Sequence, residues 1–270
     1  MKKTMDIFTH IVSGVAVATV VAPFAGKKAV KSVKILGFGA LGGAFPDIDA
    51  ISMWSRFDAT FGRLFGLSHT GREIYGEKFW YSHHAFFHSI VAALVIVAVL
   101  MFVGYAFSKT RKKNARITLA EYCKRNILLY VAFFVGYLLH LFGDMPTPSS
   151  VWGGVNMFFP ADAYIGGSGK IWWWNNYDIF LLVMLCIIVN CTVILLCKRY
   201  IRQFTLGIAL LTLVLITVQI NTRQYDYAYS GNTTKYAEME EQSKKEQERI
   251  LGKRIYNYMK WIDDRLPIHF

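Results

Sequence analysis

The sequence predicts an all-α, polytopic membrane protein with about six transmembrane helices. Of its 270 residues, 54% are hydrophobic, and the mean hydropathy is +0.32, values typical of membrane proteins. Six apolar stretches approach the ~20 residues that a helix needs to cross ~30 Å of hydrocarbon. The basic residues gather in alternate connections between these stretches, as the positive-inside rule requires.

These stretches follow one another through the first 220 residues. Two of them, 11–26 and 29–45, are short and rich in Gly and Ala, and the second carries Lys31 and Lys34 near its start. The other four contain no Asp, Glu, Lys or Arg and cover 89–107, 127–143, 179–197 and 204–220. We therefore expect a six-span membrane domain over residues 1–220.

Residues 221–270 form a separate tail that mixes Lys and Arg with Asp and Glu. Its helical pattern over 236–262 predicts an amphipathic helix that rests on the membrane surface or on the protein. We assign no chemistry to this tail.

The N-terminus also admits a second interpretation, a secretory signal peptide, because Lys2 and Lys3 precede an apolar run. Asp6 and His10 interrupt that pattern, and no small-residue cleavage site follows, so we expect the first helix to be retained. The four cysteines lack CxxC spacing, so neither a disulfide framework nor a cysteine-based zinc site is expected.

The net charge of +12 could indicate a nucleic-acid partner, but its distribution argues for topology instead. If the basic connections face the cytoplasm, residues 46–82 and 145–177 lie outside. A nucleic-acid site at the basic segment 108–125 remains the alternative explanation of the charge. The basic residues of the three connections are Lys27, Lys28, Lys31 and Lys34; Lys109, Arg111, Lys112, Lys113, Arg116, Lys124 and Arg125; and Lys198, Arg199 and Arg202.

Side chains that bind divalent metals occur in four clusters, each at the end of an apolar stretch. Carboxylates and imidazoles are costly at bilayer depth unless they are paired or bind a metal. The predicted topology brings all four clusters to the outer face, although only the basic residues determined the orientation. One metal centre would explain the seven candidates, which are His10, Asp47, Asp49, His83, His88, His140 and Asp144.

Spacing along the chain supports part of this set. His140 and Asp144 are four residues apart, so a helix places both on one face, where they could bind one ion or simply each other. His84 and His88 have the same spacing, which helices use to give two imidazoles to one metal. His83 and His88 would be about 140° apart around a helix, so the spacing favours His84 over His83.

Two aspartates follow a proline at the end of the second stretch. Pro46 ends the helix and favours an extended or turned chain, which lets Asp47 and Asp49 point the same way. Paired carboxylates suit a divalent cation and can supply a general base. Helix capping by Asp47 is the simpler alternative, and His10 alone is equally well explained as an interfacial histidine.

Four motifs follow one another along the chain: MDIFTH at residues 5–10 with Gly14, FPDID at 45–49, HHAFFHS at 83–89 and GYLLHLFGDMPTP at 136–148. Together they resemble the YdjM-like family of bacterial, membrane-bound, metal-dependent hydrolases. The resemblance covers residues 5–180 and implies a multi-pass protein of the bacterial inner membrane. The corresponding family pattern for residues 83–89 is similar to His-Arg-x-x-Thr-His-Ser. It assigns the ligand role to His83 and His88, whereas the helix spacing favours His84. In this chain His84 stands where the family pattern has arginine.

The resemblance also suggests a catalytic set. The segment 174–178 is similar to a Trp/Asn/Asp stretch in related members, which makes Asp178 a second candidate base beside Asp49, and His84 could replace the charge of the lost arginine. The family resembles, more distantly, zinc-dependent phospholipase C, a helical fold with His and Asp ligands. Zinc is the expected ion, and seven ligands exceed the four that one zinc takes, so two or more ions fit.

We therefore expect a metal-dependent hydrolase that acts on a lipid or lipid-linked phosphoester at the bilayer surface. Its Trp-rich loop, with Trp152, Trp172, Trp173 and Trp174, would lie at the interface, as an anchor or to present the head group. The alternatives are a metal-ion transporter or sensor and a structural metal site. The uncharged spans 89–107 and 179–197 count against transport, and the lack of cysteine ligands counts against a structural zinc site.

Overall fold

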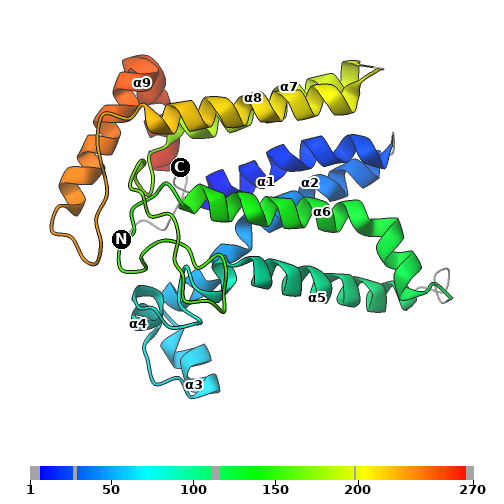
Figure 1. Cartoon of the computed structure of the whole chain (residues 1–270), viewed down its shortest axis with the longest axis horizontal. Helices are drawn as coiled ribbons and strands as arrows, with labels where there is room; N and C mark the ends of the chain where they lie inside the picture. Colours follow the sequence, from blue (N-terminus) through cyan, green and yellow to red (C-terminus); the bar gives the residue numbers. More distant parts are fainter. Residues whose placement is uncertain (1–6, 27–28, 111–115, 198, 266–270) are drawn as a thin grey trace.

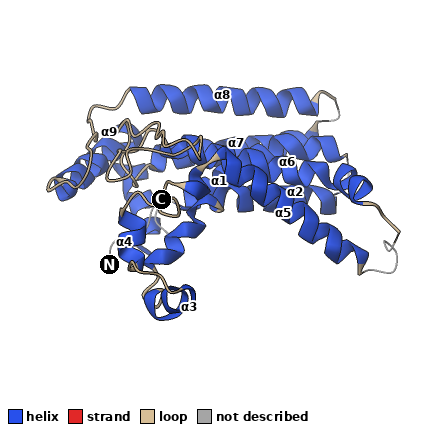
Figure 2. Ribbon diagram, turned by 60° about the horizontal axis from the view of Figure 1, so that its bottom comes forward, coloured by secondary structure: helices blue, strands red, loops and turns tan. Residues whose placement is uncertain are grey.

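The computed structural model describes residues 7–26, 29–110, 116–197 and 199–265. The predicted basic residues Lys27, Lys28 and Lys198, the cluster at 111–113 and the acidic residue Asp6 therefore lie outside the described residues. Within them the chain is helical and forms no strand, only isolated β-bridges in its loops (Figure 2). The predicted all-α class is confirmed.

Seven long helices make up most of the fold. They are α1 (Ile7–Val21), α2 (Ala29–Ala44), α5 (Ile90–Lys109), α6 (Leu119–Asp144), α7 (Tyr177–Leu196), α8 (Ile201–Asn221) and α9 (Tyr236–Arg265). Short helical elements connect them: η1 (Ala22–Ala25), η2 (Pro46–Met53), η3 (Asp58–Gly62), α3 (Arg63–Phe65), α4 (Gly71–Gly76) and η4 (Phe86–His88).

Of the helices in the described part of the chain, five are long and apolar enough to cross a membrane, namely α1 extended by η1, α5, α6, α7 and α8. The sixth expected span, α2, has 16 residues, about 24 Å at 1.5 Å per residue. It runs beside α1 and α6 and packs against both (Figure 1).

Close packing of α1, α2 and α6 depends on glycine. A Cβ atom on Gly14 would overlap the carbonyl oxygen of Gly39, one on Gly43 would overlap that of His10, and one on Gly136 would lie 2.6 Å from the oxygen of Gly39. Small residues allow helix backbones to approach each other in this way inside a bilayer. The contact places the ligand-bearing ends of the three helices together.

The basic connections lie together at one end of the bundle. The start of α2, the end of α5, the start of α6 and the α7–α8 junction all lie on the right in Figure 1. Lys31 Nζ donates to the carbonyl of Arg125 at 3.4 Å, and the guanidinium of Arg202 lies 4.6 Å from the ring centre of Phe24. The short elements η2, α3 and α4 and helix α9 lie towards the opposite end.

The Trp-rich loop differs from its predicted interfacial position. Trp152, Trp172, Trp173 and Trp174 are all less than 8% exposed and form a cluster with Tyr227 and Met239. An anchor in the head-group region would expose its rings, so the expectation of an interfacial loop is wrong. These rings are instead packed inside the protein, at the end where the ligand clusters lie.

The expected C-terminal helix is α9, interrupted by a non-helical residue at Gly252 (φ 73°). One face packs on the protein, with Tyr256 and Met259 against Phe180 and Val183 of α7. The opposite face leaves Ile255, Tyr258 and Trp261 exposed.

Candidate metal centre

Four buried side chains from three elements meet at the end of the bundle. His140 and Asp144 lie one turn apart at the end of α6, Asp47 lies on η2 directly after Pro46, and His88 ends η4. All four are at most 7% exposed. The helix turn and the proline thus place an imidazole and a carboxylate from α6 beside one of each kind from the segment between α2 and α5.

Each of the two imidazoles lies close to the other imidazole and to both carboxylates. His88 Nε2 lies 3.3 Å from His140 Nε2, 3.7 Å from Asp47 Oδ1 and 3.5 Å from Asp144 Oδ2. His140 Nε2 lies 3.5 Å from Asp47 Oδ1 and 3.2 Å from Asp144 Oδ2. Ligand atoms bound at ~2.0–2.1 Å to a tetrahedral zinc are about 3.3–3.4 Å apart. These four atoms therefore suit one small divalent ion.

His10 extends the group from α1. Its Nε2 lies 3.2 Å from Asp144 Oδ1, and its ring stacks on that of His140 with centroids 3.9 Å apart. His10, His140 and Asp144 form one of the groups whose ligand atoms lie within 4.8 Å of one another. The glycine contacts between α1 and α2 hold this end of α1 in place.

Asp49 connects the other two histidines of the predicted set. Its Oδ1 lies 2.7 Å from His83 Nδ1, and its Oδ2 lies 3.3 Å from His88 Nδ1. Asp47, Asp49 and His83 form a second group within 4.8 Å. The structure therefore brings all seven predicted ligands into one continuous, mostly buried cluster.

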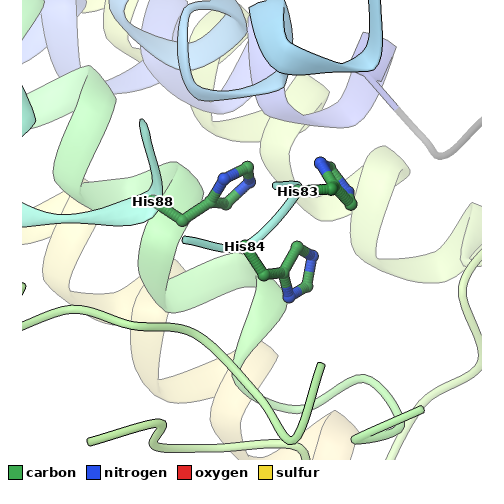
Figure 3. Close-up of side chains that lie close together, drawn as sticks. All are labelled: His83, His84 and His88. Atoms are coloured by element: carbon green, nitrogen blue, oxygen red, sulfur yellow. The ribbon is translucent and has the colours of Figure 1, made fainter. Parts of the chain in front are cut away.

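The candidate His84 belongs to this cluster as well. One of its ring nitrogens lies within 4.8 Å of a ring nitrogen of His83 and of His88, and Figure 3 shows the three imidazoles close together. His84 is 1% exposed and its Nδ1 lies 2.9 Å from the carbonyl oxygen of Gly154. The choice between His83 and His84 that spacing and resemblance left open is thus not exclusive, since both approach the cluster.

Electrostatics outside the spans favour charged carboxylates. Burial raises the pKa of Asp47, but the neighbouring His140 and His88 outweigh burial and keep that pKa well below its usual value. The pKa of Asp49 is lowered in the same way, against burial, by His83 and His88. Burial lowers the pKa of His88, yet the charge of Asp49 and the close contacts with Asp47 and Asp49 raise it to about 9. In the metal-free state a proton on His88 thus replaces part of a cation's charge.

The donor set fits a divalent metal. Several of its buried atoms make no hydrogen bond: Asp47 Oδ1, Asp49 Oδ2, both oxygens of Asp144, His88 Nδ1 and His84 Nε2. Buried polar atoms normally find hydrogen-bond partners, and imidazole with carboxylate is a donor set that zinc accepts. These atoms can bind a metal and have no hydrogen-bond partner, and their position in one cluster indicates a place for a cation.

The comparisons with known proteins agree with this architecture. The profile of the YdjM inner membrane protein family matches residues 5–225. The chain belongs to this family. No curated protein and no solved structure matches it significantly. The matched region runs from the segment before α1 to just beyond α8, so it includes all seven predicted ligands, and the whole of α9 lies outside it.

Asp178 occupies a different environment from the one predicted for a catalytic base. Arg223 donates to its Oδ1 at 3.0 Å and lies 2.9 Å from its Oδ2, and Gln247 Nε2 donates to Oδ1 at 3.0 Å. Asp178 belongs to none of the metal-compatible groups found among the described residues. The contacts of this carboxylate connect the start of α7 to α9 and to the segment between α8 and α9.

Gly43 and Tyr75 at this centre were missed by the sequence analysis, which placed Trp152 at the membrane interface instead. Gly43 accepts from His140 Nδ1 through its carbonyl oxygen at 2.7 Å, Tyr75 stacks on His83 at 4.5 Å, and Trp152 stacks on His84 at 4.6 Å. Neither the type of a residue nor its spacing along the chain predicts that its backbone carbonyl or its ring will contact a histidine of the centre. Only the fold shows that these groups orient and shield the imidazoles.

Proposed function

We propose that this member of the YdjM family is a membrane-bound, metal-dependent hydrolase that acts on a lipid or lipid-linked phosphoester. The observation that supports it most is the group of four buried side chains, Asp47, His88, His140 and Asp144, in which each imidazole nitrogen lies 3.2–3.7 Å from the other imidazole and from both carboxylates. Their position at one end of the spanning helices suits a substrate anchored in the bilayer.

These four side chains would hold the metal, with His10 beside Asp144. When bound, a divalent ion supplies Lewis acidity towards a phosphoryl group and a nucleophile near neutral pH. His140 is oriented for this role because its Nδ1 donates to Gly43, which leaves Nε2 as the lone-pair nitrogen.

Asp49 is the candidate general base. Its Oδ1 is occupied by His83 Nδ1, whereas Oδ2 makes no hydrogen bond and lies 3.3 Å from His88 Nδ1. An ionised carboxylate with one free oxygen can take a proton from an attacking water. Asp49 is 8% exposed, so its surroundings limit competition from bulk water.

The external segment next to the ligands supports a lipid substrate. η2 buries Asp47 and Asp49 but exposes Ile48 and Ile51 at 47% each. Trp54, just after η2, is also 47% exposed. Apolar and aromatic side chains at the end of spanning helices suit the membrane interface. A lipid head group would therefore reach the ligands beside this apolar surface.

The alternative function, transport or sensing of a metal ion, lacks a pathway of charged groups. In the described helices α5 and α7, the charged side chains lie at the ends, as Lys109 and Asp178 do. Intramembrane ion pathways are marked by ionisable residues within the spans. The buried polar pair Asn190 and Thr19, joined at 2.8 Å, is neutral. Hydrolysis therefore stays the preferred function.

The test is phosphate release in detergent micelles, where transport has no meaning. Purified protein is stripped with a chelator, reloaded with Zn²⁺ and offered phosphatidic acid, a lysophosphatidic acid and an isoprenyl diphosphate. We expect zinc-dependent release from at least one of them, reduced about 10²–10⁴-fold in Asp49→Asn with metal content retained. No release from any of the three by zinc-loaded protein, or release that survives chelation, would overturn the proposal.

A further inference from the structure

One ring nitrogen of the buried His84 has no hydrogen-bond partner. The side chain is 1% exposed, and its Nε2 makes no hydrogen bond. Its Nδ1 lies 2.9 Å from the carbonyl oxygen of Gly154. A carbonyl can only accept, so Nδ1 carries the proton and Nε2 carries the lone pair. A buried lone pair without a donor is costly.

The backbone at this residue is also unusual. His84 has φ 64°, in the left-handed region that residues other than Gly adopt uncommonly, although Asn, Asp and His do so more often than the rest. Such conformations persist where the surroundings fix them, frequently at functional sites. The ring is held by Gly154 and stacks between Trp152 and His88, with centroids 4.6 and 4.7 Å away. The fold thus fixes this imidazole in one orientation.

The neighbouring histidines repeat the same arrangement. The Nδ1 atoms of His140 and His83 face oxygen acceptors at 2.7 Å, on Gly43 and Asp49 respectively. A histidine that binds a metal through one nitrogen usually donates from the other to a carbonyl or carboxylate. His84 has this outer contact, and the one nitrogen that remains is the unpartnered Nε2.

We infer that His84 is itself a metal ligand, through Nε2, at a second position of the centre that it shares with His83. The first position is the one formed by Asp47, His88, His140 and Asp144. A ring nitrogen of His88 also lies within 4.8 Å of His83 and His84. Because one imidazole lone pair binds one ion, His88 can be a ligand at the first position or at the second, but not at both. A position based on two or three imidazoles selects a borderline transition metal such as zinc rather than magnesium or calcium. This inference rests on the metal centre of the proposed function, but not on hydrolysis.

The variant that tests it is His84→Asn. Asparagine tolerates positive φ and can still donate to Gly154, but its amide nitrogen has no lone pair for a metal. The matched control is His69→Asn, because His69 stacks on Phe79 and belongs to none of the metal-compatible groups in the described part of the chain. The wild type and both variants are equilibrated with buffered free Zn²⁺, and bound zinc is counted by mass spectrometry. Co²⁺ absorption per bound ion reports the ligand environment.

We expect the wild type and His69→Asn each to bind one zinc more than His84→Asn. In His84→Asn the first position should still bind its ion. The Co²⁺ absorption of the second position should be absent from this variant. Removal of an outer-sphere partner usually lowers metal affinity about 10–100-fold, so a shift confined to that range, with the same stoichiometry, would contradict ligation. Unchanged stoichiometry and affinity, or loss of every zinc from His84→Asn, would also overturn it. If zinc binding follows the expectation and no substrate is hydrolysed, the proposed function fails and this inference stands.

Discussion

At the scale of single residues, the centre consists of imidazoles whose outer nitrogens are fixed and whose inner nitrogens converge. Carbonyl oxygens of Gly43 and Gly154 and the carboxylate of Asp49 accept from His140, His84 and His83. Such outer contacts set the tautomer and the ring orientation before any ion arrives. The contacts between imidazoles and carboxylates offset part of the cost of burying these groups, and a bound cation would offset more of it.

Metal binding should depend on pH because His88 carries a proton in the metal-free protein. Its pKa of about 9 lies above the ordinary 6.5, so below pH ~9 a metal must displace that proton. We expect zinc affinity to rise with pH up to about 9 and calorimetry in buffers of different ionisation enthalpy to show proton release. A folded-state pKa above the unfolded value stabilises the metal-free protein fully below pH 6.5, and this contribution is lost as pH rises through 9. A pH-independent affinity between pH 7 and 9 would contradict this assignment.

Asp178 should affect stability rather than the metal centre. Removing one partner of a buried ion pair costs roughly 3–5 kcal/mol, so Asp178→Asn should lower the Tm in detergent while zinc stoichiometry stays that of the wild type. The double variant Asp178→Asn, Arg223→Gln should recover part of the lost Tm, since it leaves no buried charge alone. Loss of zinc from a folded Asp178→Asn variant would instead mean that Asp178 takes part in metal binding.

At the scale of elements, the ends of α1, α2 and α6 must stay in register for the ligands to meet. A Cβ on Gly43 would overlap the carbonyl of His10, whereas a Cβ on Gly37 in the same helix would have no atom within 4 Å. Both glycines lie within α2. The close contact, and not helix propensity, therefore decides which glycine matters.

We expect Gly43→Ala to lower the Tm, with a cost of about 1–3 kcal/mol for overpacking, and to weaken zinc binding because Gly43 also orients His140. Gly37→Ala should leave both unchanged. Thermal unfolding in detergent and zinc titration of the two variants measure this. Equal behaviour of the pair would mean that the α1–α2 contact does not position the centre.

The elements also show what the sequence could predict. Apolar length and charge were sufficient to locate α5, α6, α7 and α8 and the helical character of α9, because hydrophobic runs and helical periodicity are local signals. The assignment of His10, Asp47, His140 and Asp144 to one cluster followed from topology. The burial of Trp152 and the pairing of Asp178 with Arg223 depend on contacts with the α8–α9 segment, which no local pattern encodes.

At the scale of the whole molecule, charge is segregated along the bundle axis. The basic connections lie at one end and the ligand clusters lie towards the other (Figure 1). The positive-inside rule therefore predicts that the ligand end faces outwards. A site on that side would meet lipids of the outer leaflet rather than cytoplasmic solutes.

Cysteine labelling tests this orientation. In a variant with the four native cysteines replaced, exposed Ser68→Cys and Ala120→Cys are each treated with a membrane-impermeant maleimide in right-side-out vesicles. We expect Ser68→Cys to react at once and Ala120→Cys only after the membrane is permeabilised. The reverse pattern would put the centre on the cytoplasmic face.

The central claim is that distant parts of the chain form one cation-binding centre beneath the membrane surface. Its most direct test is the metal content of the purified protein beside that of the His140→Ala, Asp144→Ala double variant, with Gly37→Ala as a folded control. We predict that the wild type and Gly37→Ala carry bound zinc and that the double variant, still folded by size exclusion, has lost zinc from the four-ligand position. Equal metal in all three proteins, or none in any after growth with zinc, would contradict the account.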